Sequence, residues 1–152
     1  MISSKNFILI TAGDPASIST EITIKTIESI KKNKNIKSIV ITDPNLVEEN
    51  IALLKSNIRI HEINDILNFT DYKDGYLNII ALKLENQFYF GKPDIKNFSF
   101  IKSSITIAAD VYFKSVASAI VTNPINKYIM HKAGFNFEGH TDFLATLSKK
   151  KI

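Results

Sequence analysis

The sequence predicts an α/β protein in which a mainly parallel sheet lies between layers of helices. Short runs of consecutive apolar residues, such as Phe7–Ile10 and the Ile-Val-Ile at the centre of Ser38–Thr42, are typical of strands buried on both faces. Each run is followed by a turn rich in Gly, Asp or Pro and then by apolar residues at helical spacing. This alternation of strand and helix predicts the α/β/α layering.

The first half of the chain contains two such units. The strand Phe7–Ile10 is followed by a helix over about 17–32, whose expected apolar face is Ile18, Ile22, Ile27 and Ile30. After the strand Ser38–Thr42, Asp43 and Pro44 are suited to the N-cap and first turn of a second helix. The apolar positions of that helix are Leu46, Val47, Ile51 and Leu54.

The second half is expected to continue the sheet with strands at Ile58–Ile60, Leu77–Leu82 and Ala119–Val121. Before the last strand, one long helix is predicted by the spacing of Ile101, Ile105, Ala108, Ala109, Tyr112 and Val116. Two helices follow it: a short one capped by Asn126 and ending at Lys132, and a last one from about Thr141 to Lys149.

Composition narrows the classes of function. The net charge of +4 comes largely from short lysine clusters without interleaved aromatic residues, so we expect no nucleic-acid partner. The chain has no cysteine, which excludes disulfides and thiolate metal sites. No signal peptide and no apolar run of about 18 residues is recognisable, so we expect a cytoplasmic protein without a membrane partner.

The first candidate site is the segment Thr11–Glu21, where a strand, a glycine-containing loop and a helix start follow one another. Such an arrangement can direct backbone N–H groups at an anion, and Asp14 is a possible anion or substrate contact. The segment lacks the lysine and paired glycines of a P-loop. The alternative is that Asp14 and Ser17 only cap the helix.

The second candidate site is the segment 122–142. Lys127 follows a strand end and could pair with an anionic group, or it could simply be solvated. His140 could donate a hydrogen bond to a substrate oxygen or carboxylate, and Gly139 before it gives the backbone freedom. Thr141 and Asp142 also suit the start of the last helix.

No metal site is expected within this chain. A protein metal site needs about three ligands, and no two histidines stand at the i, i+4 spacing that places them together on a helix. His61 and His131 therefore have weaker claims to function than His140.

Several segments together resemble the 4-hydroxythreonine-4-phosphate dehydrogenases of pyridoxine biosynthesis. They occur in the family's order, and the similarity extends from about residue 6 to 148. The resembling segments are Thr11–Ala16 with Ile18 and Glu21, Gly91-Lys92-Pro93, Val121–Lys127, Ala133-Gly134 and Gly139–Phe143. The last segment, Gly-His-Thr-Asp-Phe, is the most specific of them.

The resemblance implies a fold like that of the isocitrate and isopropylmalate dehydrogenases, with two α/β/α lobes, an active site between them and a homodimeric assembly. It implies oxidation of 4-phosphohydroxy-L-threonine with NAD or NADP, followed by decarboxylation, on the route to pyridoxal 5'-phosphate. It also implies a divalent metal held by histidines, which would act as a Lewis acid. His140 and Thr141 match the family's substrate-contacting pair.

The chain departs from the family in two respects. Ser17, Ser19 and Thr20 stand where the family usually has Gly, Gly and Pro, and the serines would impair the loop if positive φ or close backbone approach were needed there. Full-length members are also considerably longer than this chain.

From this length we expect residues 1–152 to be the N-terminal portion of such an enzyme, with an incomplete fold. About 1–120 would be the first lobe, and about 121–152 an inter-lobe segment carrying the substrate-site motifs. The metal ligands and most of the cofactor site would lie in the absent C-terminal half, so the chain alone is expected to be inactive. The alternative is a non-catalytic half that binds a phosphate ester or complements a separate C-terminal chain.

Overall fold

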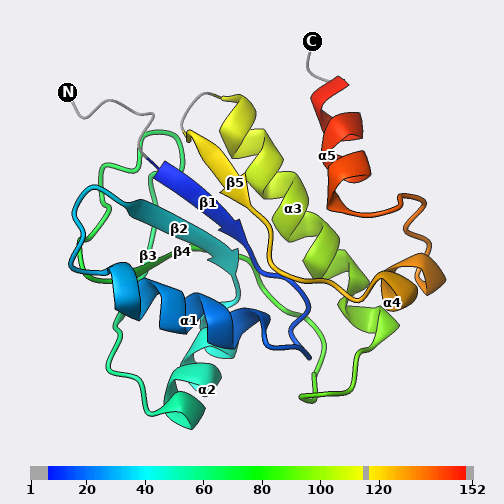
Figure 1. Cartoon of the computed structure of the whole chain (residues 1–152), viewed down its shortest axis with the longest axis horizontal. Coiled ribbons are helices and arrows are strands. Elements are labelled where there is room, and N and C mark those ends of the chain that lie inside the picture. Colours follow the sequence, from blue (N-terminus) through cyan, green and yellow to red (C-terminus); the bar gives the residue numbers. More distant parts are fainter. Residues whose placement is uncertain (1–6, 115–116, 150–152) are drawn as a thin grey trace.

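A parallel sheet forms the centre of the protein in a computed structural model that describes residues 7–114 and 117–149. Within these residues the sheet has five strands in the order β3-β4-β2-β1-β5, and every pairing is parallel (Figure 1). The strands are β1 (Phe7–Thr11), β2 (Lys37–Thr42), β3 (Ile60–Glu62), β4 (Leu77–Ala81) and β5 (Ala119–Val121). The predicted α/β class with a mainly parallel sheet is confirmed.

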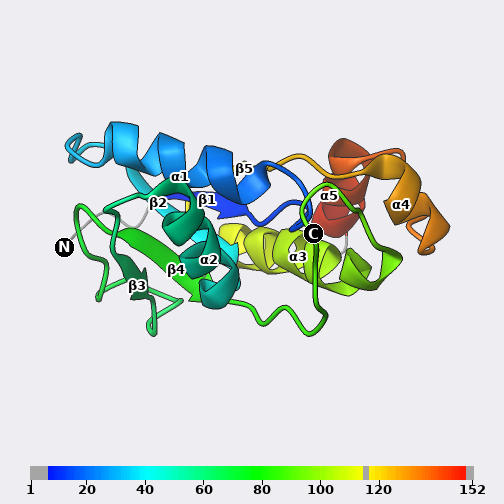
Figure 2. The same ribbon diagram turned by 90° about the horizontal axis from the view of Figure 1, so that it is seen from below.

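Helices cover both faces of the sheet, as Figures 1 and 2 show. One face is covered by α1 (Ser19–Ile30) and α2 (Pro44–Leu54), and the other by α3 (Phe98–Phe113), which follows the 3-10 turn η1 (Ile95–Asn97). After β5, the short helix α4 (Lys127–Lys132) leads to α5 (His140–Lys149), which packs on α3. In both views α4 and α5 lie at the end of the molecule away from β3.

The strands alternate their side chains between the two helical layers, as the two-residue period of a strand requires. Leu9 of β1 belongs to the core cluster that includes Ala108 and Val111 of α3. The next residue, Ile10, belongs to the cluster with Ile24 of α1. Burial on both faces explains why these strands read as continuous apolar runs in the sequence.

The predicted apolar face of the first helix is partly wrong. Ile18 and Ile22 are exposed, whereas the buried residues of α1 include Thr20, Thr23 and Ile24. The Thr23 hydroxyl donates to the Ser19 carbonyl at 2.9 Å and bonds the Asn123 side chain, so this polar residue is satisfied in the interior. Threonines therefore occupy the buried face at the start of α1. For this reason the pattern of apolar residues alone predicted the wrong face of the helix as buried there.

Other boundaries differ by a few residues. The third strand begins at Ile60 rather than Ile58, because Ile60 is the residue that pairs with Leu77 of β4. The long helix begins at Phe98, its Tyr112 is 39 % exposed rather than buried, and the predicted Val116 lies outside the described residues. The last helix starts at His140, one residue earlier than predicted.

Asp43 caps α2 as predicted, and its second carboxylate oxygen has a further role. Oδ1 accepts hydrogen bonds from the N–H groups of Asn45 and Leu46, at 2.7 and 3.3 Å. Oδ2 accepts from the N–H of Leu84 at 2.6 Å, which joins the start of α2 to the chain after β4. One side chain therefore fixes two segments at the carboxyl edge of the sheet.

Candidate functional site

The two segments singled out in the sequence meet at the carboxyl ends of β1 and β5. These strands are neighbours and parallel, so the chain leaves both of them at the same edge of the sheet. The N–H of Asp14 donates to the carbonyl of Pro124 at 3.1 Å, and the Ser19 hydroxyl donates to the same oxygen at 3.1 Å. The Asn123 side chain donates to the Thr11 carbonyl at 2.9 Å.

The glycine that this junction requires is Gly13. Its φ is +71°, and a Cβ added there would lie 2.3 Å from the Ser19 hydroxyl oxygen and 2.8 Å from Cβ of Asn123. Neither Ser17 nor Ser19 has a positive φ, and Ser19 is fully buried with its hydroxyl bonded. The serines therefore fit this loop without a positive φ and with bonded hydroxyl groups.

Asp14 is buried, and its carboxylate bonds within its own loop. Oδ1 accepts from the N–H of Ala16 at 2.9 Å, while burial raises the pKa of the carboxyl group above its ordinary range. The residue before α1 is Ile18, which makes no side-chain cap. The alternative that Asp14 caps the helix is therefore wrong, although the Ser17 hydroxyl does accept from the N–H of Ser19, the first helical residue.

The structure brings Lys127 and His140 together. The Asn126 side chain caps α4 by accepting from the N–H of Ile129 at 3.1 Å, so Lys127 stands at the start of that helix. Its ammonium nitrogen lies 3.5 Å from the position that a Cβ on Gly139 would occupy, and Gly139 immediately precedes His140. The missing side chain at position 139 leaves room for the lysine beside the histidine.

His140 has an unsatisfied ring nitrogen. Among the described residues no group bonds its Nε2, although this atom is shielded from solvent. Burial, and then the charge of Lys127, lower the pKa of the imidazole, so it is neutral near pH 7. A neutral ring N–H beside an ammonium group can bind an anionic oxygen, such as that of a carboxylate or phosphate ester.

The same electrostatics argue against a metal ion at His140, because Lys127 would repel a cation. Within residues 7–114 and 117–149, no group of three or more His, Cys, Asp or Glu side chains is placed to hold a metal. The residues present therefore do not fit the divalent metal that the resemblance implies.

Thr141 and Asp142 lie in the first turn of α5 and are exposed, as the start of a helix would place them. Asp142 Oδ2 accepts from the N–H of Glu138 at 3.4 Å. Phe143, the next residue, is buried, and its ring packs on Phe135 with centroids 5.2 Å apart. This aromatic contact anchors α5 and, with it, the position of His140.

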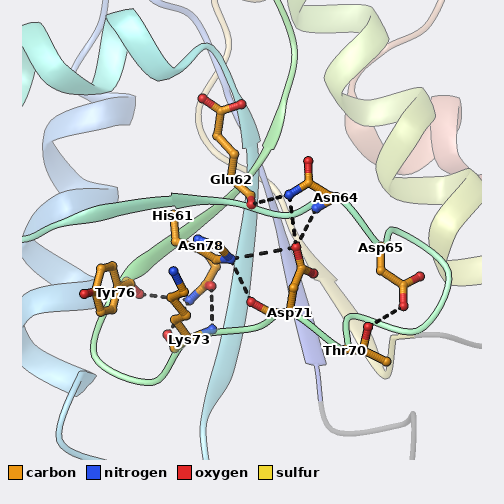
Figure 3. Close-up of polar contacts among 9 residues, drawn as sticks. All are labelled: His61, Glu62, Asn64, Asp65, Thr70, Asp71, Lys73, Tyr76 and Asn78. Atoms are coloured by element: carbon orange, nitrogen blue, oxygen red, sulfur yellow. Dashed lines mark hydrogen bonds and ion pairs between the residues drawn. The ribbon is translucent and has the colours of Figure 1, made fainter.

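The other two histidines bond backbone carbonyls, partners that the sequence did not reveal. His61 Nε2 lies 2.7 Å from the Asp71 carbonyl oxygen, in a network that holds the loop between β3 and β4 (Figure 3). Asp71 in turn accepts from the N–H of Asn64 at 2.8 Å, which lowers the pKa of its carboxyl group. His131 Nε2 lies 2.7 Å from the Phe137 carbonyl oxygen.

An apolar groove of about 500 Å³ opens beside the first candidate segment. Two of its walls are joined by a backbone hydrogen bond of 2.8 Å from the N–H of Gly91 to the carbonyl of Ala16. The sequence analysis missed this groove because its walls come from three distant segments; they include Ala16, Ile18, Leu53, Leu54, Phe90 and Pro93. Over the described part of the chain, no helix is both long and apolar enough to cross a membrane.

Comparison with known proteins identifies the family to which this chain belongs. The profile described as "Pyridoxal phosphate biosynthetic protein PdxA" matches residues 34–152, which include Lys127, His140 and Thr141. The chain belongs to the PdxA family. Among curated members, 4-hydroxythreonine-4-phosphate dehydrogenase of Geobacter metallireducens is 29% identical over 150 residues, covering 97% of this chain and 44% of that protein. An enzyme of the same name from Methylorubrum extorquens is 29% identical over 154 residues, which cover 99% of this chain and 44% of that enzyme.

Solved structures agree on the fold. The crystal structure of a 4-hydroxythreonine-4-phosphate dehydrogenase from Burkholderia phymatum superposes with a TM-score of 0.82 at 25% identity, covering 95% of this chain and 44% of that one. The corresponding protein from Klebsiella pneumoniae gives a TM-score of 0.81 at 24% identity, covering 95% and 45%. The expected isocitrate dehydrogenase-like class is confirmed. The chain spans less than half the length of the curated PdxA relatives that it matches.

Proposed function

We propose that this chain forms the N-terminal part of the substrate site of a 4-hydroxythreonine-4-phosphate dehydrogenase. The proposal is carried by His140, whose solvent-shielded Nε2 is without a partner among the described residues and lies on the segment next to Lys127. The Lys127 ammonium group attracts an anionic group of the substrate, and the His140 N–H and Thr141 hydroxyl orient it by hydrogen bonds. Asp14 stays a possible substrate contact at the neighbouring loop.

The reaction proposed for the whole enzyme is oxidation of 4-phosphohydroxy-L-threonine by NAD or NADP, followed by decarboxylation, in pyridoxal 5'-phosphate biosynthesis. The described residues provide binding and orientation of an anionic substrate. We assign no residue of this chain to the dinucleotide or to a divalent metal. The homodimer and the cytoplasmic location belong to the same proposal, as does the division into a first lobe over about 1–120 and an inter-lobe segment over about 121–152.

Substitution of His140 tests the proposed site. In the enzyme completed with the C-terminal half of a relative, His140→Ala is expected to lower kcat/KM at least about tenfold, on the order of 1.4 kcal/mol. His61→Ala is the control for loss of a histidine elsewhere, because His61 lies in β3, at the opposite edge of the sheet from β5, and its Nε2 is held by the Asp71 carbonyl at 2.7 Å. An unchanged kcat/KM in His140→Ala would remove His140 from the substrate site.

A second candidate function is a non-catalytic half that binds the phosphate ester or assembles with a separate C-terminal chain. The observation that favours it is the unpartnered Nε2 of His140 beside Lys127, because binding an anionic ester needs neither the dinucleotide nor the metal. Under either candidate we expect no NAD reduction by the 152-residue chain alone with 4-phosphohydroxy-L-threonine. Robust turnover by the chain alone would overturn this expectation.

A further inference from the structure

The loop between α4 and α5 determines where His140 stands. α4 ends at Lys132; Gly134 follows with a φ of +95°, and the N–H of Phe135 donates back to the carbonyl of Met130 at 3.0 Å. The Phe135 side chain is buried against Phe143, which fixes the first part of the loop. The following residues, Asn136 to Gly139, are half-buried or exposed. The Phe137 ring packs on Phe135 and Phe143, with centroids 5.1 and 4.9 Å apart, so the side chain of this segment has an apolar anchor and its backbone is left to a polar one.

His131 supplies a polar anchor for this second part. Its Nε2 lies 2.7 Å from the Phe137 carbonyl oxygen, three residues before His140. A carbonyl oxygen only accepts hydrogen bonds, so the bond requires a proton on Nε2. Nε2 carries that proton in the corresponding neutral tautomer and in the imidazolium form, so the bond persists when His131 is protonated. The neighbouring bond, from the Glu138 N–H to Asp142, is longer at 3.4 Å.

We propose that His131 is a positioning residue, whose bond to the Phe137 carbonyl holds the 136–139 segment so that His140 stands beside Lys127. His131 contacts no substrate in this arrangement and acts only through His140. The effect of His131 on catalysis rests on the proposed function. Its effect on the position of His140 does not.

Histidine NMR on this chain tests the proposal, because the sequence contains only three histidines. Burial and the Lys127 charge lower the pKa of His140, so a loosened loop should let its titration midpoint rise toward the ordinary value. We expect this rise in His131→Ala, and a return of the midpoint toward that of the unmodified chain in His131→Gln, whose amide can donate to the same carbonyl. The charged residues near His140 are Lys127, Glu138 and Asp142, and their charges also contribute to its titration midpoint.

His61→Ala is the control for general loss of stability. It removes an equally short bond, 2.7 Å, to a carbonyl at the opposite end of the sheet. Both alanine variants are expected to melt at a lower temperature, but only His131→Ala should move the His140 midpoint. An unmoved midpoint in His131→Ala, or an equal movement in His61→Ala, would overturn the proposal.

A measurement on the unmodified chain covers the case in which His131→Ala does not fold. The 15N shifts of His131 at neutral pH should report protonated Nε2, and a neutral ring protonated on Nδ1 alone would contradict the bond. In the completed enzyme, His131→Ala should raise KM about fivefold with kcat nearly unchanged, because it loosens substrate binding. If His140→Ala were without effect there while the His140 midpoint still moved in His131→Ala, the proposed function would fail and the positioning role would stand.

Discussion

At the scale of single residues, Gly13 stands where the two candidate segments meet. An added Cβ would lie 2.3 Å from the Ser19 hydroxyl oxygen and 2.7 Å from Cβ of Ser19, at a φ of +71°. We therefore expect Gly13→Ala to lower the free energy of unfolding by at least about 2 kcal/mol, through steric overlap and backbone strain together. Urea denaturation of the two proteins measures the difference.

Gly75→Ala separates the steric cost from the backbone cost. Gly75 has a similar φ of +79°, but nothing lies within 4 Å of an added Cβ. This variant should lose only about 1 kcal/mol, the cost of the left-handed conformation for a residue with a Cβ. Equal losses in the two variants would show that the junction around Gly13 is not tightly packed.

His140 should make stability depend on pH. Its pKa is lowered in the folded protein from the ordinary 6.5, so the unfolded chain binds the proton more readily. The stability contributed by the neutral ring is present above pH 6.5 and is lost as the pH falls through the lower folded pKa. His140→Gln should flatten the unfolding free energy over this range, which denaturation at several pH values would reveal; an unchanged pH dependence would contradict the lowered pKa.

The sequence allowed residues of the candidate site to be named but not all of their partners. Lys127 could be named because it follows a strand end at the start of a helix, and His140 because it stands in a specific motif. The bond between His131 and Phe137 could not, since two residues six positions apart meet only through the path of a particular loop. For the same reason His61 seemed to lack partners, although Asp71 was ten positions away.

At the scale of elements, Asp43 links the start of α2 to the chain that follows β4. Asp43→Ala would remove the cap and leave the Leu84 N–H, bonded at 2.6 Å, without its acceptor. We expect a loss of about 2 kcal/mol in the free energy of unfolding, about half from the cap and half from the unsatisfied donor.

Asp94→Ala is the matched control for this prediction. Asp94 caps the 3-10 turn η1 through one bond, from the Lys96 N–H at 2.9 Å, and is half-buried. Its loss should cost about 0.5 kcal/mol, the lower end of the range for caps. If thermal or urea denaturation gave the same loss for both variants, the second bond of Asp43 would contribute nothing.

Most elements could be predicted because apolar runs and capping residues are local signals. The start of α1 shows where such signals fail: Ile18 and Ile22 are exposed, while Thr20 and Thr23 are buried. The Thr23 hydroxyl satisfies its hydrogen bonds inside the protein, one of them with Asn123, a hundred residues away in sequence. No local pattern encodes a partner at that separation.

At the scale of the whole molecule, the alternation of strands and helices predicted a parallel sheet but not the order of its strands. The order β3-β4-β2-β1-β5 makes β1 and β5 neighbours, and this places the two candidate segments side by side. The general rule that ligands collect at the carboxyl edge selected both segments separately. Their direct contact, through Asn123 and Pro124, follows only from the strand order.

The apolar groove beside α1 should bind hydrophobic dyes in the folded protein. Leu53 and Phe90 line it and are 65% and 47% exposed. We expect anilinonaphthalene sulfonate to fluoresce with the native chain, and Leu53→Ser to reduce this signal without lowering stability appreciably. Leu67→Ser is the control, because Leu67 is 57% exposed but is not among the groove residues. An equal reduction in both variants would show that the dye does not occupy the groove.

The pairing of β1 with β5 has a consequence for the order in which the protein can fold. Asn123 bonds Thr11 across a separation of 112 residues, and β1 lies between β2 and β5 in the sheet. During synthesis β1 can pair early with β2, but its second edge stays open until β5 has left the ribosome. Because such distant contacts are entropically costly to form, the junction that carries Gly13 and leads to His140 is expected to be among the last parts of the fold to become ordered.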